Sequence, residues 1–378
     1  MRVALVTESF LPLVNGVANS VVRTAEHLMR RGHEPFVIAP QPTDRRTPID
    51  LPYPVYRISS LPMPGYPEIR LGLPTPTMTA AMRAHRTDVV HLASPFFLGA
   101  WGMTAARSLG LPMVAVYQTD IASYSRLYHH GMTERAAWSW IRKVHNKAHR
   151  TLVPSTESAA ALTEHGVDRL HIWRRGVDDV RFHPDHRDSE LRRRLAPNGE
   201  VIVGFIGRLA MEKQVDLLAG VSRQPGVRLV VVGDGPAAGD LHKALPEATF
   251  LGVKHGEELS RLYASLDIFV HTGPYETFGQ AIQEAMASGV PVVAPAKGGP
   301  LDLVHQDLTG LLVPPFVEQG FTDAVASLVA DPARRAAYGV AGRAAIEGRS
   351  WSAVGDELIG HYRAVMETAA APALAAAA

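Results

Sequence analysis

The sequence predicts an α/β protein made of two doubly wound parallel-sheet domains that face each other across a cleft. The chain has 378 residues, enough for two domains of about 150 residues, each with its own core. Apolar runs of strand type alternate with segments of helical spacing in both halves, as in βαβ units with helices on both faces of a sheet. A hydrophobic content of 46% and a charged content of 20% argue against a disordered chain or a multi-spanning membrane protein.

The first half begins with the elements of such a sheet. Residues 3–7 form an apolar run that predicts a buried strand, and residues 16–31 carry apolar side chains at helical spacing. Gly32 is placed to end this helix, and residues 34–39 form the next expected strand. Three further apolar runs predict strands that continue the sheet: residues 89–92, 113–116 and 151–153.

A proline-rich segment separates the early strands from the later ones. Residues 41–77 contain nine prolines, and each proline removes a hydrogen-bond donor from a strand ladder. The segment is therefore expected to be a loop with one or two short strands. Loops of this length in compact domains usually have a function.

The second half repeats the alternation of strand and helix. Six strands are expected: residues 201–206, 227–232, 248–251, 268–271, 291–294 and 310–313. The polar stretch 175–198 is expected to link a first domain, residues 1–175, to a second domain, residues 198–350. Residues 369–378 are nearly all alanine and predict a flexible tail. Because parallel-sheet domains bind ligands at the carboxyl ends of their strands, candidate residues are sought there.

The charge is distributed unevenly, although the net charge is only +1. Residues 1–175 hold 20 Lys and Arg against 12 Asp and Glu, a net +8, whereas residues 176–378 hold 18 against 25, a net −7. This asymmetry suggests that the first half meets an anionic substrate or surface. The alternative is that the charged side chains are merely solvated and unevenly distributed between the two halves.

Several classes of protein are disfavoured by what the sequence lacks. There is no cysteine, which excludes a disulfide scaffold, a thiolate metal site and a cysteine nucleophile. No stretch approaches the roughly 18 to 20 apolar residues of a spanning helix. The first residues show no signal-peptide cleavage site, so a cytoplasmic location is expected.

Two cations lie where an anion is expected to bind in the second half. Arg208 and Lys213 directly follow the expected strand 201–206, within the sequence VGFIGRLAMEKQVDLL. Free backbone N–H groups and the dipole of the following helix favour an anion there, and a diphosphate suits the two cations. The alternatives are solvated surface residues or a structural ion pair with Glu212.

Two carboxylates follow the expected strand that ends at His271. Glu276 and Glu284 stand eight residues apart in YETFGQAIQEAMASGVP, which corresponds to about 12 Å along a helix. A glycoside hydrolase pair needs roughly 5 to 9.5 Å, so this pair is better suited to hold different parts of a long, hydroxyl-rich ligand. The alternative is a pair of solvated helix charges, against which the apolar neighbours of Glu284 argue.

Two glycine segments also lie at expected strand ends. Gly16 lies between the first strand and the first helix, where it allows a close backbone approach to a phosphate. Gly298, Gly299 and Pro300 form either an anion-holding turn or an ordinary tight turn. The absence of GxGxxG and of the Walker spacing disfavours a nicotinamide site and a P-loop.

No metal and no resident cofactor are expected. The sequence contains no Asp-x-Asp and no HExxH, although it has 17 histidines. A leaving diphosphate would then be stabilised by cationic side chains and dipoles in place of Mg²⁺.

A basic segment in the first half indicates a possible membrane contact. Residues 126–150 hold six Lys and Arg, one Glu and two tryptophans, and a basic helix with interfacial aromatics can lie on an anionic bilayer. The candidates for this contact are Arg135, Trp138, Arg142, Lys143 and Lys147. The alternative is that the helical spacing of Trp138 and Ile141 places them in the core. No nucleic-acid partner is expected, because no reading motif accompanies the charge.

Taken together, the motifs resemble those of the retaining GT-B glycosyltransferases of family 4. The resemblance is carried by GRLAMEK, by ETFGQAIQEAMASGVPVVA with its two glutamates, and by the Arg-Gly-Val-Asp of residues 175–178. Three further segments are similar to the group of actinobacterial GDP-mannose-dependent α-mannosyltransferases of glycolipid synthesis: TESFLPLVNGVANSV, PMPGYPEIRLGLP and YQTDIASY. The sulfoquinovosyl transferases of sulfolipid synthesis share this grouping.

The resemblance implies a role for each candidate residue. The implied catalytic residues are Arg208, Lys213 and Glu276, of which the two cations bind the donor diphosphate and Glu276 holds hydroxyls of the donor sugar. The implied donor-binding set also includes the backbone of Gly16, Phe278 and Gly279, the loop around Val253 for the base, and Glu284 for the ribose.

The resemblance also bears on the first domain. The final helix, residues 351–368, is implied to return to that domain. Gln118 and Asp120 are placed near the sugar and the acceptor. Gln118 stands where many relatives have a histidine, and its amide can hydrogen-bond a hydroxyl but cannot carry a proton.

The predicted function is retaining transfer of a sugar, mannose from GDP-mannose, to a hydroxyl of a glycolipid or lipid-linked acceptor. The expected partners are a nucleotide sugar, a lipid acceptor and an anionic membrane surface, with the protein peripheral to the inner face of the plasma membrane. The alternatives are transfer of glucose or sulfoquinovose from a UDP-sugar, a sugar-nucleotide epimerase and a two-lobed sugar-binding protein.

Overall fold

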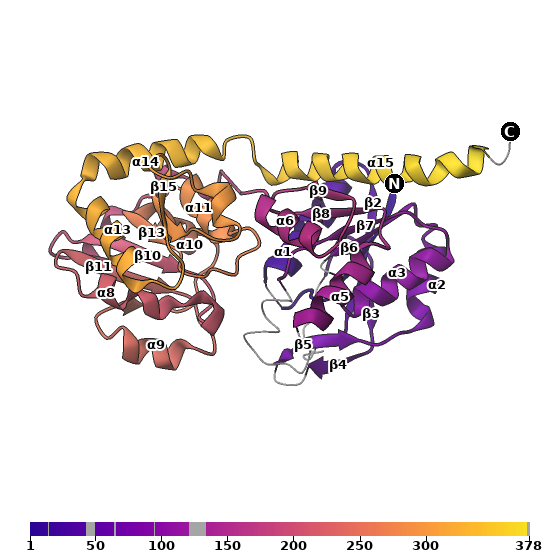
Figure 1. The fold of residues 1–378 in the computed structure, drawn as a ribbon, viewed down its shortest axis with the longest axis horizontal. Helices are drawn as coiled ribbons and strands as arrows, with labels where there is room; N and C mark the ends of the chain where they lie inside the picture. The colour runs from indigo at the N-terminus through magenta and orange to yellow at the C-terminus, as the bar shows by residue number, and fades with distance from the viewer. Residues whose placement is uncertain (14, 43–49, 64–65, 94, 121–133, 376–378) are drawn as a thin grey trace. The chain divides into compact units, whose positions relative to one another are not determined.

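The computed structural model describes residues 1–13, 15–42, 50–63, 66–93, 95–120 and 134–375. The chain divides into two units (Figure 1). Unit 1 comprises Met1–Arg174 together with Trp351–Ala378, and unit 2 comprises Arg175–Ser350. Each unit is an α/β structure built on its own parallel sheet, which confirms the predicted fold class.

The sheet of unit 1 has the strand order β3-β2-β1-β6-β7-β8-β9, and all its neighbouring strands are parallel. Its strands are β1 (Arg2–Thr7), β2 (Glu34–Pro40), β3 (Val55–Ile58), β6 (Val89–Ala93), β7 (Met113–Val116), β8 (Arg150–Val153) and β9 (Leu170–Ile172). The order reverses between β1 and β6, which creates a topological switch point at their carboxyl ends.

Alternation along β1 explains why helices cover both faces of this sheet. Val3 and Leu5 pack in one core cluster with residues of the first and last helices, whereas Ala4 and Val6 pack on the opposite face. The helices are α1 (Gly16–Arg30), α2 (Pro76–Ala84), α3 (Leu98–Ser108), α5 (Glu134–His145), α6 (Thr156–Glu164) and α15 (Trp351–Ala375). None of the helices within the described residues is long and apolar enough to cross a membrane.

The proline-rich segment contains more structure than its prolines predict. Its described residues, 41–42, 50–63 and 66–77, form three strands: β3, which is the edge strand beside β2, and the antiparallel pair β4 (Ser60–Met63) and β5 (Tyr66–Gly72). The expectation of one or two short strands was therefore wrong. Pro62 is tolerated because it lies in a two-stranded ribbon, next to a register shift between Pro62 and Met63.

The last helix, α15, packs on unit 1 through specific polar contacts. His27 Nε2 lies 2.8 Å from Asp356 Oδ1, and Arg31 pairs with the same carboxylate. The Tyr362 hydroxyl lies 2.8 Å from His91 Nδ1 in the core. Gly355 allows the close approach, since a Cβ at that position would lie 2.4 Å from the His27 ring. The helix continues to Ala375, past the expected end at residue 368.

The sheet of unit 2 has the order β12-β11-β10-β13-β14-β15, again entirely parallel. Its strands are β10 (Val201–Ile206), β11 (Val227–Val232), β12 (Thr249–Phe250), β13 (Ile268–Val270), β14 (Val292–Pro295) and β15 (Gly310–Val313). The order reverses between β10 and β13, so the carboxyl ends of these two strands form the second switch point.

Helices cover both faces of this sheet as well. The longer ones are α10 (Gly256–Ser265), α11 (Gln280–Ala287), α13 (Glu318–Ala330) and α14 (Pro332–Ala345). The shorter α-helices are α7 (Ser189–Leu195), α8 (Ala219–Ser222), α9 (Ala238–Ala244) and α12 (Pro300–Leu303). The 3₁₀ turns are η1 (Pro184–His186), η2 (Met211–Lys213) and η3 (Val215–Leu218).

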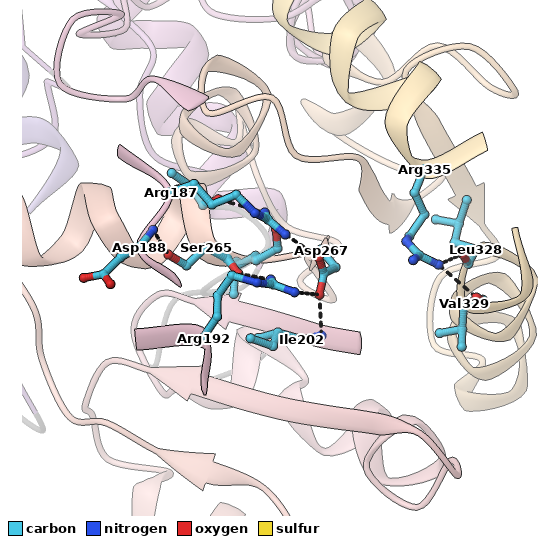
Figure 2. A network of polar contacts seen from close by, with 11 residues as sticks. Arg187, Asp188, Arg192, Ile202, Ser265, Asp267, Leu328, Val329 and Arg335 are labelled. Atoms are coloured by element: carbon cyan, nitrogen blue, oxygen red, sulfur yellow. Dashed lines mark hydrogen bonds and ion pairs between the residues drawn. The ribbon is translucent and has the colours of Figure 1, made fainter. Parts of the chain in front are cut away.

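The stretch that the sequence predicts as a linker is part of unit 2. Figure 2 shows the contacts that hold it: the Asp267 carboxylate accepts from Arg187 at 2.8 Å, from Arg192 at 3.0 Å and from the Ile202 amide at 2.9 Å. Burial alone would raise the pKa of Asp267, but the amide and the two guanidinium groups hold it below its ordinary value. This ionised carboxylate anchors α7 at the amino ends of β10 and β13.

Candidate active site

The loop that carries Arg208 is held in place by the end of β11 and the loop that follows it. The Gly207 amide donates to Val232 O at 3.0 Å, and the Leu209 amide donates to Asp234 O at 2.9 Å. Gly233 has φ +137° and approaches so closely that a Cβ there would lie 1.9 Å from the Gly207 carbonyl oxygen. Only glycine permits this contact. Arg208 is thus an exposed cation on a fixed backbone at the carboxyl end of β10.

Lys213 ends the 3₁₀ turn η2 and lies against the segment that follows β13. The buried Thr272 hydroxyl donates to the Lys213 carbonyl at 2.6 Å, which ties the two strand ends together. The Lys213 ammonium pairs with Oε1 of Glu276, and both side chains are about four-fifths buried, with 19% and 20% exposed. The structure thereby brings two residues of the predicted site into direct contact, although 63 residues separate them in the chain.

Glu276 is held in its ionised form by the basic groups that lie around it. Burial alone would raise the pKa of its carboxyl group, but the Lys213 ammonium and the His271 ring hold that pKa well below its ordinary value. His271 Nε2 lies 3.4 Å from Glu276 Oε1. Burial lowers the pKa of the Arg175 guanidinium to about 10, an effect that the nearby charge of Glu276 opposes. A fixed negative charge among three basic side chains is the central electrostatic feature of unit 2.

The glycine pair after β14 supports the loop that carries Glu276. The Gly299 amide donates to the Glu276 carbonyl at 2.7 Å. Gly298 has φ +73°, and a Cβ at that position would lie 2.5 Å from the same carbonyl oxygen. A Cβ at Gly299 would lie 2.1 Å from the Phe278 carbonyl oxygen. These glycines therefore permit close backbone packing on the loop that carries Glu276.

Phe278 and Gly279 lead from this loop into α11. The Phe278 side chain is buried in the core of unit 2, which fixes the backbone at that position. Gly279 has φ +101°, and its carbonyl accepts from the amides of Ile282 and Gln283 in the first turn. The left-handed conformation at Gly279 turns the chain sharply into the helix.

Glu284 lies in the second turn of α11, and its partners differ from those of Glu276. Burial raises the pKa of Glu284 to about 7, an effect that the Tyr263 hydroxyl and the Gln280 amide partly offset. Tyr263 itself is fully buried. The two glutamates thus have opposite electrostatic environments: one is held as an anion, and the other titrates near neutral pH.

The remaining donor-site candidate of unit 2 is Val253, which follows β12. Its side chain is 53% exposed, next to Lys254, which pairs with Glu258 at 2.5 Å. Val253 is thus an exposed apolar side chain on the loop that follows β12.

Three candidates belong to unit 1. Gly16 is the first residue of α1, after Asn15, whose side chain accepts from the Ala18 amide and caps the helix. A Cβ at Gly16 would meet nothing within 4 Å, so the space beside this helix start is open. Gln118 is buried after β7, and Asp120 accepts from the Tyr117 hydroxyl at 3.3 Å.

The basic helix predicted as a membrane contact is α5. Arg135, Arg142 and Lys143 on this helix are exposed, and so is Lys147, which follows its end. Trp138 is half-buried and stacks on the His165 ring at a centroid distance of 3.7 Å. The indole N–H of Trp140 donates to the Phe96 carbonyl, so this tryptophan is also engaged within the unit. Residues 126–133 of the basic segment and residues 121–124 of YQTDIASY lie outside the described residues.

Comparison with known proteins identifies the family. A model of Glycosyltransferase Family 4 matches residues 14–181, and one of Glycosyl transferases group 1 matches residues 187–345. The chain is 51% identical over 369 residues to a GDP-mannose-dependent alpha-mannosyltransferase of Mycobacterium tuberculosis, covering 97% of each chain. The chain belongs to glycosyltransferase family 4. A second GDP-mannose-dependent alpha-mannosyltransferase, from Mycolicibacterium smegmatis, is 49% identical over 370 residues, covering 97% of this chain and 98% of the relative.

Solved structures show the fold of this glycosyltransferase. The sucrose-phosphate synthase of Thermosynechococcus elongatus superposes with a TM-score of 0.82, covering 97% of this chain and 99% of the other, at 21% identity. The fold is therefore GT-B, as the resemblance implied. Within the described residues, no group of three or more His, Cys, Asp or Glu side chains is arranged to hold a metal ion.

Some residues of the site were given no role by sequence reasoning. His271 and Thr272 follow β13 and contact Glu276 and Lys213, respectively. Arg175 lies near Glu276, and Gln283 donates to the Arg175 carbonyl at 3.1 Å. The one signal in the sequence that could have indicated a role for His271 was its position, because it was expected at the end of a strand next to the site.

The raised pKa of Glu284 predicts a specific dependence of stability on pH. Between its ordinary pKa of 4.5 and about pH 7, Glu284 keeps a proton in the folded protein that the unfolded chain has already released. The free energy of unfolding therefore falls as the pH rises across this range. Glu284→Gln removes this loss. The melting temperature of Glu284→Gln, relative to that of the unsubstituted protein, should therefore rise between about pH 5 and about pH 8. Glu247→Gln, at an exposed position of unit 2, is the control. A constant difference across this range would contradict the assignment.

Proposed function

We propose that this glycosyltransferase transfers mannose from GDP-mannose to a hydroxyl of a lipid-linked acceptor, with retention of the α configuration. The observation that carries the proposed donor is the match to the two mycobacterial relatives, whose names specify GDP-mannose-dependent alpha-mannosyl transfer. These relatives align over nearly the full chain, including the segments that carry Arg208, Lys213, Glu276 and Glu284.

The proposed donor site uses the two cations at the carboxyl end of β10. Arg208 and Lys213 bind the diphosphate, and Lys213 turns from Glu276 toward the phosphate oxygens when the donor enters. Glu276 then accepts hydrogen bonds from hydroxyls of the mannose. Because the negative charge on the diphosphate grows as the sugar bond breaks, fixed cations stabilise the transition state more than the bound donor.

The proposed reaction proceeds on one face of the sugar. The bond between mannose C1 and the diphosphate oxygen breaks, and the acceptor oxygen forms its bond to C1 from the same side. The proton of the acceptor hydroxyl passes to the departing diphosphate, so the products are the mannoside and GDP. This route requires no nucleophilic side chain. It needs only that the diphosphate be held and its charge neutralised, which is the role assigned to Arg208 and Lys213.

The remaining candidates bind the rest of the donor and the acceptor. The backbone at Gly16, at the start of the 15-residue helix α1, offers N–H groups and a helix dipole to the diphosphate. Glu284 binds the ribose, and the loop around Val253 contacts the base. Gln118 hydrogen-bonds the sugar as a neutral amide, and Asp120 lies near the acceptor.

The lipid acceptor suggests how the enzyme meets its substrate. The exposed cations of α5 offer a basic surface that attracts anionic headgroups, each worth about 1 kcal/mol near such a surface. We propose that the protein binds peripherally to an anionic membrane through this helix. The contact is electrostatic in character, because Trp138 and Trp140 are engaged within unit 1.

The donor proposal is tested by binding and by transfer. GDP-mannose should raise the melting temperature more than UDP-glucose or UDP-sulfoquinovose at equal concentration, because a ligand stabilises according to its excess over its dissociation constant. Labelled mannose should move from GDP-mannose into the organic phase of a lipid extract, and a chelator should leave the rate unchanged. A preference for a UDP-sugar, or conversion of the nucleotide sugar without transfer, would refute the proposed function. Loss of activity that Mg²⁺ restores would refute metal independence.

Lys213→Ala tests the leaving-group role. The substitution should lower kcat by about 10² or more, as the loss of one charge-stabilising donor commonly does. Arg228→Ala is a matched control, because it removes an ion pair with Glu200 at the amino ends of β10 and β11. Melting curves should show that both variants are folded. A turnover close to that of the unsubstituted protein for Lys213→Ala would exclude the leaving-group role.

Charge reversal on α5 tests the membrane contact. The double variant Arg142→Glu and Lys143→Glu should bind vesicles of anionic lipid at least about tenfold more weakly, since two favourable charges become repulsive. The control reverses the adjacent exposed pair Arg193 and Arg194 of unit 2 in the same way. Equal losses in both double variants would show a general charge effect and no specific role for α5.

A further inference from the structure

The ring of His271 lies directly behind Glu276. The residue follows β13, its amide donates to the Val293 carbonyl at 2.9 Å, and only 3% of its surface is exposed. The ring lies nearly parallel to that of Phe205, with an interplanar angle of 14° and a centroid distance of 6.4 Å. Gly273 closes over the ring, since a Cβ there would lie 3.3 Å from His271 Nε2. The packing therefore fixes the orientation of the imidazole.

The carboxylate of Glu276 is the polar group that this buried ring faces. Nε2 lies 3.4 Å from Glu276 Oε1, the oxygen that Lys213 also contacts. Within the described part of the chain, both ring nitrogens, Nδ1 and Nε2, are buried without a hydrogen bond, so the 3.4 Å contact of Nε2 with Glu276 Oε1 is a close polar contact that has not become a hydrogen bond. Buried polar side chains in native proteins are usually hydrogen-bonded. A buried imidazole that lacks such bonds and lies against one carboxylate oxygen therefore calls for an explanation.

Donor binding, as proposed above, would change the partners of Glu276. When Lys213 turns to the diphosphate, the buried carboxylate loses its closest cation. Leaving one partner of a buried ion pair alone is strongly unfavourable. A second group on Glu276 Oε1 would stabilise the carboxylate during this exchange, and His271 is already in that position.

We propose that His271 is a positioning residue for donor binding: it holds the Glu276 carboxylate in place so that Lys213 can leave Glu276 for the donor diphosphate. This inference rests on the proposed function. His271 contacts no donor atom in this scheme and acts through Glu276 alone. Arg175 is a further basic group near Glu276, and it lies on the segment before the first strand of unit 2.

The test is a double-mutant cycle on donor affinity, measured by calorimetry with GDP-mannose and no acceptor. His271→Phe keeps a ring against Phe205 but removes both nitrogens. It should raise the Kd by about tenfold, because the donor complex then lacks the hydrogen bond that Nε2 donates to the Glu276 carboxylate once Lys213 has turned away. In the Glu276→Gln background the same substitution should change the Kd by less than about twofold, because the interacting charge is gone. His271→Gln, which retains an N–H donor, should bind within about threefold of the unsubstituted protein.

The controls separate this role from a structural one. His145→Phe replaces another histidine that is 3% exposed, and it should leave the Kd unchanged whatever its effect on stability. Equal effects of His271→Phe in both backgrounds would overturn the positioning role, as would a His271→Gln variant as weak as His271→Phe. If His271→Phe does not melt cooperatively, His271→Met replaces it in the same cycle with the same outcomes. Absence of GDP-mannose binding by the unsubstituted protein would instead refute the proposed function.

Discussion

The ion pair between Lys213 and Glu276 is the interaction on which the candidate site depends. It joins the carboxyl ends of β10 and β13, the two strands between which the strand order of unit 2 reverses. Because both side chains are largely buried, neither charge is tolerated without the other or a replacement. In the proposed donor complex the diphosphate would take the place of Glu276 as the anionic partner of Lys213.

The contacts around this pair fix the backbone of both residues. Thr272 fixes the Lys213 carbonyl, and the glycines at 298 and 299 let the next loop pack on the backbone of Glu276 and Phe278. At the opposite edge of the sheet, Asp267 ties Arg187 and Arg192 to the amino ends of the strands. The polar contacts at the two ends of the strands therefore have different roles. Those at the amino ends secure a long segment of chain, and those at the carboxyl ends position charged groups.

The two glutamates of the site show how position in the fold sets charge. Glu276 lies among basic side chains and remains ionised, whereas Glu284, eight residues later, lies against the buried Tyr263 and has a pKa of about 7. The same residue type thus supplies a fixed anion at one place and a titratable group at another. Assigning the first to the sugar and the second to the ribose is consistent with their separate sets of partners.

The sequence by itself determined the parallel-sheet architecture, because alternating apolar runs and helical spacing are local properties of the chain. It also placed Arg208, Lys213, Glu276 and Glu284 near strand ends, since position after a strand can be read from order alone. It predicted too few strands in residues 41–77, because prolines are unfavourable in a strand ladder although edge strands and two-stranded ribbons tolerate them. It also treated residues 175–198 as a linker. Only the tertiary structure decided that Lys213 meets Glu276, that His271 faces the same oxygen and that Gly298 and Gly299 support a loop. These are contacts between segments remote in sequence, and their energies depend on distance and burial, which no local pattern contains.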